Sequence, residues 1–218
     1  MENNYYINEL FYSIQGEGKY MGYPCIFVRF SDCNLKCNWC DTTYSFNEGN
    51  YLKKYEIIEK IEKFNANLVE ITGGEPLIHD NVYSLIETLN KINKKILIET
   101  NGSISIEKIP DYVHIILDLK PPSSNVNTDT NLYSNIKLLK KSDEVKIVIQ
   151  NQEDLIWTHK TIQKYPQLLN LENPPTLQVA FEKFNMTNLA KYILESNITF
   201  KMGIQMHKYI FPKDARGV

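Results

Sequence analysis

Residues 24–41, PCIFVRFSDCNLKCNWCD, decide the class of fold, because an apolar, strand-like run leads directly into a loop that carries three cysteines. Cys33, Cys37 and Cys40 are separated by three and then two residues. This spacing gathers three thiolates about one point, one fewer than the four that close a zinc or ferredoxin site. The open position predicts a further ligand that the protein does not supply.

Apolar, strand-like runs alternate with amphipathic helical runs along the chain. The expected core strands are 25–30, 67–71, 95–99, 113–119, 144–149 and 176–180, and the expected helices are 55–64, 81–93, 131–140, 154–165 and 186–195. An extra N-terminal strand is expected at 5–14 and a closing strand at 199–206. The alternation predicts an α/β fold with a mainly parallel sheet. A length of 218 residues favours one domain, 1–218, with a substantial core.

Charge and hydropathy narrow the functional classes. The 24 basic and 26 acidic residues nearly cancel, so we expect no recruitment of nucleic acid or of an anionic membrane. The N-terminus is polar and acidic, and no apolar run approaches the roughly 18 to 20 residues that span a bilayer. We therefore expect a cytoplasmic protein with no membrane partner. In that reducing compartment, clustered cysteines indicate metal ligands rather than disulfides.

Polar and glycine residues follow several of the expected strands. Segment 72–76 (TGGEP) follows the second strand, 100–102 (TNG) the third and 118–121 (DLKP) the fourth. Parallel α/β sheets bind ligands at the carboxyl ends of their strands, so these segments should meet the cysteine loop at one rim. The two glycines of TGGEP remove side chains where a ligand must approach the backbone. His207, at the end of the closing strand, is the histidine expected to reach this rim, and the other three are expected to be structural.

The cysteines alone leave other readings open. They could be incidental thiols, a zinc-binding module completed by a histidine or by Cys25, or a non-catalytic iron-sulfur electron carrier with four thiolates. Cys25 is a weak fourth ligand, because it lies within an apolar strand where a cysteine behaves as a small core residue.

The spacing of Cys33, Cys37 and Cys40 resembles that of radical S-adenosylmethionine (SAM) enzymes. The resemblance implies that the three thiolates hold three irons of a [4Fe-4S] cluster, whose fourth iron binds the methionine part of SAM. TGGEP resembles the GGE motif of that superfamily, with Gly74 at the position that contacts the cofactor through its backbone. Trp39 matches the position beside the adenine.

Three further segments resemble one family within the superfamily, the 7-carboxy-7-deazaguanine synthases of queuosine biosynthesis. They are 11–18 (FYSIQGEG), 40–42 (CDT) and 205–211 (QMHKYIF) followed by RGV. The resemblance implies a carbon-nitrogen lyase that converts 6-carboxy-5,6,7,8-tetrahydropterin into 7-carboxy-7-deazaguanine and releases ammonia. It implies substrate contacts at Ile14, Gln15, Gly16, Arg29, Thr72 and His207, a Mg²⁺ ligand at Thr42, and further SAM contacts at Asp118, Lys120, Gln178, Val179, Ala180 and Phe181. The chain departs from the family pattern at 118–120, where a serine is expected before the lysine, and at 179–180, where a proline is often found.

The resemblance also implies an architecture and partners. We expect an incomplete (β/α)6-type partial TIM barrel with reduced helices and an extra N-terminal strand, closed by formation of a homodimer. An external reductant such as a flavodoxin would be needed, and no catalytic residue is expected beyond the cofactor radical, so no strong acid-base pair should be present. The alternative within the superfamily is an activase that forms a glycyl radical on a partner protein. Arg29, Thr42 and the QGEG segment favour a small anionic substrate instead.

Overall fold

The computed structural model describes residues 4–126, 129–212 and 215–218. Its described strands form one nine-stranded sheet in the order β3-β1-β2-β4-β5-β6-β7-β8-β9. The strands are β1 (Asn4–Ile14), β2 (Pro24–Phe30), β3 (Asn50–Lys53), β4 (Leu68–Gly73), β5 (Lys95–Thr100), β6 (His114–Leu119), β7 (Glu144–Ile149), β8 (Thr176–Val179) and β9 (Lys201–Gly203). Pairing is parallel from β2 through β9, whereas β1 pairs antiparallel with both β2 and β3. The mostly parallel α/β fold is confirmed, and the order of strands is that of an open sheet.

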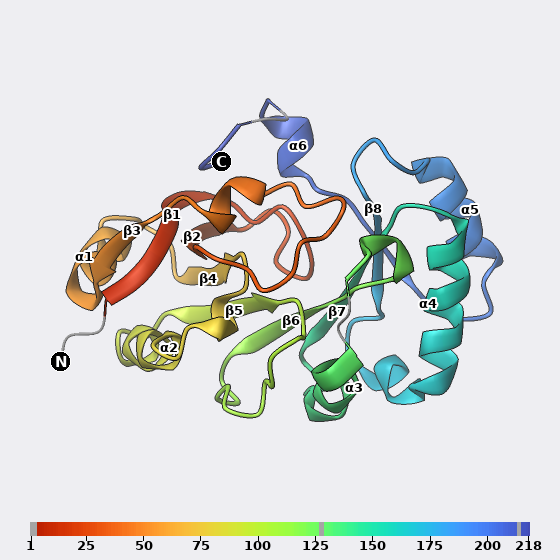
Figure 1. Ribbon diagram of the computed structural model, residues 1–218, viewed down its shortest axis with the longest axis horizontal. Helices are drawn as coiled ribbons and strands as arrows, with labels where there is room; N and C mark the ends of the chain where they lie inside the picture. Colours follow the sequence, from red (N-terminus) through yellow and green to blue (C-terminus); the bar gives the residue numbers. More distant parts are fainter. Residues whose placement is uncertain (1–3, 127–128, 213–214) are drawn as a thin grey trace.

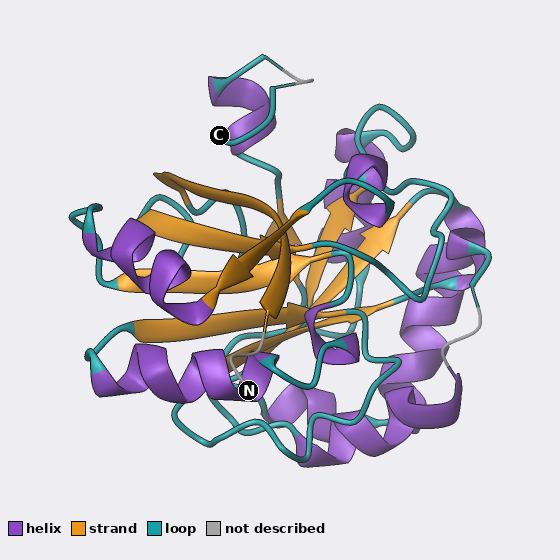
Figure 2. Cartoon of the chain, turned by 60° about the vertical axis from the view of Figure 1, so that its left-hand side comes forward, coloured by secondary structure: helices purple, strands orange, loops and turns teal. Residues whose placement is uncertain are grey.

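Of the six helices formed by the described residues, five cover one face of the curved sheet and the sixth lies apart from them near the C-terminus (Figures 1 and 2). They are α1 (Lys54–Glu62), α2 (Val82–Lys91), α3 (Asp129–Leu138), α4 (Gln152–Lys164), α5 (Met186–Glu195) and α6 (His207–Ile210). Short 3-10 helices occur at η1 (Thr43–Phe46), η2 (Pro76–Ile78), η3 (Pro122–Ser124) and η4 (Pro166–Asn170). None of the helices formed by the described residues has the length and apolar character needed to cross a bilayer.

The expected core strands and the five longer helices are confirmed with small shifts at their ends. The closing strand was wrong in extent, because only Lys201–Gly203 pairs with β8 and the chain then turns toward α6. His207 consequently begins a short helix instead of ending a strand. Strand β3 and helix α6 were not predicted.

The parallel strands bury both faces, and each face has its own composition. Residues such as Ile96 and Ile98 of β5 belong to the core beneath the helices. The alternate residues point to the opposite, concave face. At the amino-terminal half of that face lies a small apolar cluster of Cys25, Phe27, Leu68, Leu97 and Ile116. Beyond it, toward the carboxyl ends, the same face becomes polar, which places a hydrophilic site above an apolar base.

Candidate active site

A cavity of about 700 Å³ opens at the carboxyl ends of the parallel strands. Its walls come from the cysteine loop after β2, the loop after β1, the strand ends and the C-terminal segment 215–218. All but one of the expected site residues line it: Cys33, Cys37, Cys40, Trp39, Thr42, Gly74, Asp118, Lys120, Gln178, Ala180, Phe181, Ile14, Gln15, Gly16, Arg29, Thr72 and His207. Segments distant in sequence therefore meet at the rim that the strand-end pattern predicted.

Val179 is the exception. Its side chain packs against the apolar cluster on the helix side of the sheet, whereas Gln178 lies on the cavity side. Successive residues of a strand face opposite sides, so the side chain of Val179 points away from the cavity while that of Gln178 faces it. Only the backbone of Val179 could contact a ligand in the cavity.

The three cysteines of the loop are free thiols, each half-buried at the cavity wall. Burial raises the pKa of the Cys33 thiol to about 11, and burial likewise raises the pKa of Cys37. Two N–H groups point at the sulfur of Cys33, from the Leu35 backbone at 3.5 Å and from the Asn101 side chain at 3.9 Å. Ligation by iron would therefore replace protons on these thiols, as is usual for thiolate sites.

Cys25 lies in a different environment. It begins the buried part of β2, with no exposed surface, and belongs to the apolar cluster at the other end of the strand. Cys25 and Phe30, at the loop end, are five positions apart along the strand, a rise of about 16 Å. Burial raises the pKa of its thiol strongly. The expectation that Cys25 is a core residue is confirmed.

The paired glycines let two loops of the chain pack closely against each other. A Cβ at Gly73 would lie 2.2 Å from the Phe30 carbonyl oxygen, and a Cβ at Gly74 would lie 1.9 Å from the Asp32 carbonyl oxygen. The Gly74 N–H donates to the Phe30 carbonyl at 3.1 Å, and the Glu75 N–H donates to the Asp32 carbonyl at 2.9 Å. The absent side chains thus let the β4 loop lie directly against the start of the cysteine loop.

Glu75 joins this loop to the end of β5. Its carboxyl is fully buried and accepts hydrogen bonds from the Leu77 N–H at 3.0 Å, the Asn101 N–H at 2.7 Å and the Thr100 hydroxyl at 2.9 Å. Burial outweighs these hydrogen bonds and raises the pKa of Glu75 to about 7. Because Asn101 also contacts Cys33, the GGE segment, the β5 end and the cysteine loop form one connected structure.

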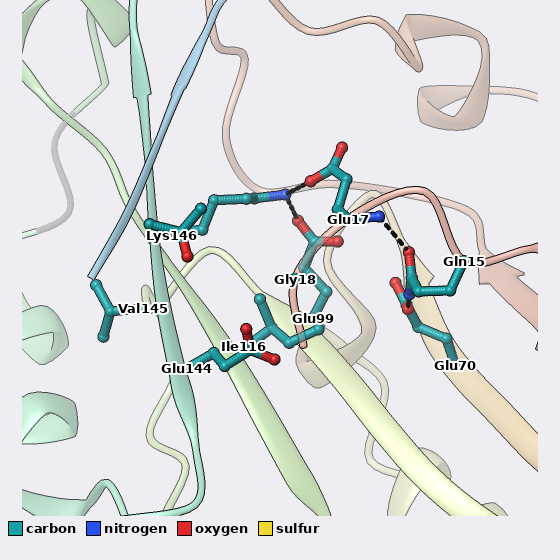
Figure 3. Close-up of a pocket in the computed structure, with 10 residues that line it drawn as sticks. Gln15, Glu17, Gly18, Glu70, Glu99, Ile116, Glu144, Val145 and Lys146 are labelled. Carbon is teal, nitrogen blue, oxygen red and sulfur yellow. Dashed lines mark hydrogen bonds and ion pairs between the residues drawn. The ribbon is translucent and has the colours of Figure 1, made fainter. Parts of the chain in front are cut away.

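A buried charged cluster lies deeper in the cavity and was missed from the sequence (Figure 3). Lys146 of β7 bridges Glu17, at 2.8 Å, and Glu99 of β5. Burial alone would lower the pKa of Lys146, but the two carboxylates raise it well above its usual value. Burial raises the pKa of Glu99, whereas Lys146 overcomes burial at Glu17 and lowers the pKa of that carboxyl. The lysine therefore stays charged while it holds two acids at the cavity floor.

The sequence did carry a signal for this cluster. Within the buried strands, polar residues recur at alternate positions: Glu70 and Thr72, Glu144 and Lys146, and Thr176 and Gln178. Alternation with period two places each pair on the same face.

Arg29 lies at the carboxyl end of β2 and uses one side of its guanidinium within the protein. Its Nε donates to Glu9 of β1 at 3.0 Å, and the Tyr44 hydroxyl donates to the same carboxylate oxygen at 3.1 Å. The terminal nitrogens of the guanidinium are thus left to donate to an anion in the cavity. The Thr42 hydroxyl lies 3.6 Å from the Cys40 sulfur, at the edge of the cysteine loop.

Lys120 and Asp118 form a buried ion pair at the end of β6, with 2.7 Å between Nζ and Oδ2. Burial alone would lower the pKa of Lys120, but Asp118 and Cys37 raise it strongly. The opposite wall carries His207, where burial lowers the pKa of the imidazole. The Met206 N–H donates to the Gly16 carbonyl at 3.0 Å and holds α6 against the loop after β1.

The other three histidines lie outside the cavity wall. His79 contacts the Ser31 carbonyl at 2.8 Å, His114 is paired with Glu144 at 2.8 Å, and His159 contacts Gln163.

A second, small cavity of about 20 Å³ is lined in part by the charged cluster (Figure 3). Glu70, Glu99, Glu144 and Thr176 are among its lining residues. One Glu144 oxygen and the Thr176 hydroxyl are buried without a hydrogen-bond partner among the described residues. The volume and the polar lining suit about one water molecule.

The donor set at the mouth of the large cavity fits an iron-sulfur cluster. No three His, Cys, Asp or Glu side chains in the described part of the chain stand close enough together to hold a single metal ion. In a cubane cluster each thiolate binds a different iron atom, so the three sulfurs surround the whole cluster. Three half-buried thiols on one loop, facing a cavity with room for a further ligand, meet that requirement.

Comparisons with known proteins show which family the chain is similar to. Residues 27–151 match the model of the Radical SAM superfamily. The 7-carboxy-7-deazaguanine synthase of Chlorobaculum tepidum is 35% identical over 215 residues, covering 97% of this chain and 96% of that protein. The enzyme of the same name from Methanospirillum hungatei is 37% identical over 205 residues, covering 94% and 84%. The crystal structure of QueE from Escherichia coli shares the fold, with a TM-score of 0.75 at 23% identity over 94% of this chain and 95% of that one.

Proposed function

Because the chain belongs to the radical SAM superfamily and, within it, to the 7-carboxy-7-deazaguanine synthase family, we propose that it is the lyase that converts 6-carboxy-5,6,7,8-tetrahydropterin into 7-carboxy-7-deazaguanine with release of ammonia. One observation carries the proposal: the cysteine loop and the residues expected to bind an anionic heterocycle line the same cavity. A cavity of about 700 Å³ is within the usual range for small-molecule and cofactor sites.

Cys33, Cys37 and Cys40 would hold the [4Fe-4S] cluster at the cavity mouth. When bound, the cluster and SAM supply the 5'-deoxyadenosyl radical that starts the ring contraction. Gly74, Trp39, Asp118, Lys120 and the segment 178–181 would bind SAM. The Lys120 ammonium is held in place by Asp118, and its remaining N–H groups can donate to a carboxylate.

The substrate would lie deeper, between Arg29 and His207. The terminal nitrogens of Arg29 form a planar fork that suits the pterin carboxylate. Thr42 would provide one oxygen to a Mg²⁺ ion whose other ligands are substrate oxygens and water, since Mg²⁺ requires an octahedron of oxygens. Ile14 to Gly16 and Thr72 would contact the ring system, and the charged floor of Glu17, Lys146 and Glu99 would exclude apolar molecules of similar size.

Two partners complete the proposal. The sheet does not close on itself among the described strands, and its edges β3 and β9 could be covered in a homodimer. An external one-electron reductant such as a flavodoxin would reduce the cluster.

We also propose that residues 1–218 act as one domain.

The test is anaerobic reconstitution with iron and sulfide, followed by incubation with SAM, a reductant, Mg²⁺ and 6-carboxytetrahydropterin, with mass spectrometry of the products. We expect 7-carboxy-7-deazaguanine together with methionine. Arg29→Ala and Thr42→Ala should keep the cluster and the slow, substrate-independent cleavage of SAM while losing pterin turnover. Cleavage of SAM by the wild type without any deazapurine would reject the assigned substrate. Loss of SAM cleavage in both variants would reject the substrate-binding roles of Arg29 and Thr42.

A further inference from the structure

Glu70 is an unusual side chain for its place in the sheet. It lies in the middle of β4, only 3% exposed, and its register partners on the two neighbouring strands are Phe27 and Leu97. In the described chain it forms no ion pair: the nearby Lys146 is held by two other acids, and Arg29 is held by Glu9. A buried carboxyl without a cation is costly unless hydrogen bonds compensate it.

The compensating partner is Gln15, in the loop after β1. The Gln15 side-chain amide donates from Nε2 to a carboxyl oxygen of Glu70 (Figure 3). Its Oε1 accepts a hydrogen bond from the Glu17 N–H at 3.0 Å. Gln15 is itself only 4% exposed. Both ends of this amide are therefore engaged within the protein, and Glu70 connects the centre of the sheet to segment 14–18.

Segment 14–18 in turn supports much of the cavity wall. The Gly16 carbonyl accepts the N–H of Met206, and a Cβ at Gly16 would lie 2.5 Å from Nδ1 of His207, so the segment and helix α6 are in direct contact. Glu17 in the same segment holds Lys146 and accepts a hydrogen bond from Gln205 at 3.2 Å. Any displacement of Gln15 would move these groups together.

We propose that Glu70 is a positioning residue, which fixes segment 14–18 through Gln15 and thereby places His207 and Glu17 at the substrate pocket. The assignment rests on the proposed function for the identity of the substrate, but the Glu70–Gln15 contact stands on geometry alone. Burial, reinforced by the nearby Glu99, raises the pKa of Glu70 well above its usual value. A neutral carboxyl accepts from the Gln15 amide without placing another negative charge beside Glu17 and Glu99.

The chemistry of this contact predicts how strongly each variant of Glu70 weakens substrate binding. Glu70→Gln is neutral and keeps a side-chain oxygen that can accept from Gln15, whereas Glu70→Leu has similar volume but no acceptor. The leucine variant leaves the buried amide of Gln15 without its partner. We expect this to weaken by about tenfold any ligand binding that requires segment 14–18 in its native position. Glu59→Leu on the exposed face of α1 is the matched control for the change in side chain.

The experiment measures the dissociation constant of 6-carboxytetrahydropterin by anaerobic calorimetry on the reconstituted enzyme, beside the rate of SAM cleavage without substrate. We expect Glu70→Leu to bind about tenfold more weakly and Glu70→Gln to stay within about twofold of the wild type. Substrate-independent cleavage of SAM should be the same in all, which a general loss of structure would not allow. Equal binding by Glu70→Leu and the wild type, or equal losses in the glutamine and leucine variants, would overturn the proposal.

A cycle of variants separates this inference from the proposed function. Glu70→Leu, Gln15→Leu and the double variant are compared by urea unfolding of the apo protein, which needs no substrate. We expect the two single changes to be non-additive, because either one already breaks the contact. Additive effects would overturn the positioning role even if the pterin is the substrate. Failure of the wild type to bind the pterin, with strong coupling between the two residues, would reject the substrate and leave the contact intact.

Discussion

Gly74→Ala should destabilise the protein through crowding. The added Cβ would lie 1.9 Å from the Asp32 carbonyl oxygen and 2.8 Å from the Cβ of Cys33, so the cysteine loop must move by more than 1 Å to reach ordinary contact distance. That movement breaks the hydrogen bonds from Gly74 to Phe30 and from Glu75 to Asp32. Two lost hydrogen bonds and an overpacked contact together cost about 3 to 5 kcal/mol.

Gly22→Ala is the matched control for this variant. Gly22 has a φ of +92° but nothing within 4 Å of its Cβ position, so alanine there costs backbone strain of about 1 to 2 kcal/mol without crowding. The free energy of unfolding is measured in urea on the apo proteins, and iron and sulfide per chain are measured after reconstitution. We expect Gly74→Ala to lose both stability and cluster, and Gly22→Ala to keep the cluster. A loss below about 1 kcal/mol at Gly74, with full iron content, would refute the crowding argument.

Two further predictions concern single side chains. Cys33→Ala should abolish the cluster, whereas Cys25→Ala should keep it and lower the free energy of unfolding by about 1 kcal/mol. Iron content and urea unfolding measure the two effects. Loss of the cluster in Cys25→Ala would contradict the open coordination position. The raised pKa of Glu75, about 7, means that its contribution to stability is present below the pKa of an unfolded glutamate and is lost as pH rises through about 7. The unfolding free energy of wild type relative to Glu75→Gln should therefore fall by about 2 kcal/mol between pH 5 and pH 8, and a constant difference would refute the shift.

The regular part of the fold was predictable because parallel strands are buried on both faces. Runs such as those of β6 and β7 are short, mostly apolar and separated by helical periodicity, which few other structures produce. Strand β3, Asn50–Lys53, was not predictable in the same way. It is a four-residue edge strand, NYLK, without a continuous apolar run, and its pairing with β1 depends on the position of a hairpin distant in sequence.

The parts of the site that directly follow a strand in the sequence were predictable. The cysteine loop and TGGEP each follow a strand, and parallel strands bring such segments to one rim. The ion pair between Lys146 and Glu17 joins residues that are 129 positions apart, and no local sequence pattern predicts such a pairing. The burial of Lys146 could still have been inferred, since it lies in a strand with an apolar neighbour on either side.

The concave face is divided along the strand direction, and this division separates stability from chemistry. Phe27, Leu97 and Ile116 form a packed apolar layer near the amino-terminal ends, and a ligand cannot displace such a layer without losing its packing energy. The layer therefore sets the depth of the cavity. Glu70 is the polar residue paired in register with Phe27 and Leu97 of this layer. The boundary between the apolar layer and the polar cavity therefore lies at the Glu70 side chain. On the concave face, side-chain changes below Glu70 should alter the free energy of unfolding, whereas changes of cavity-lining side chains above it, such as Arg29, should alter the binding of ligands.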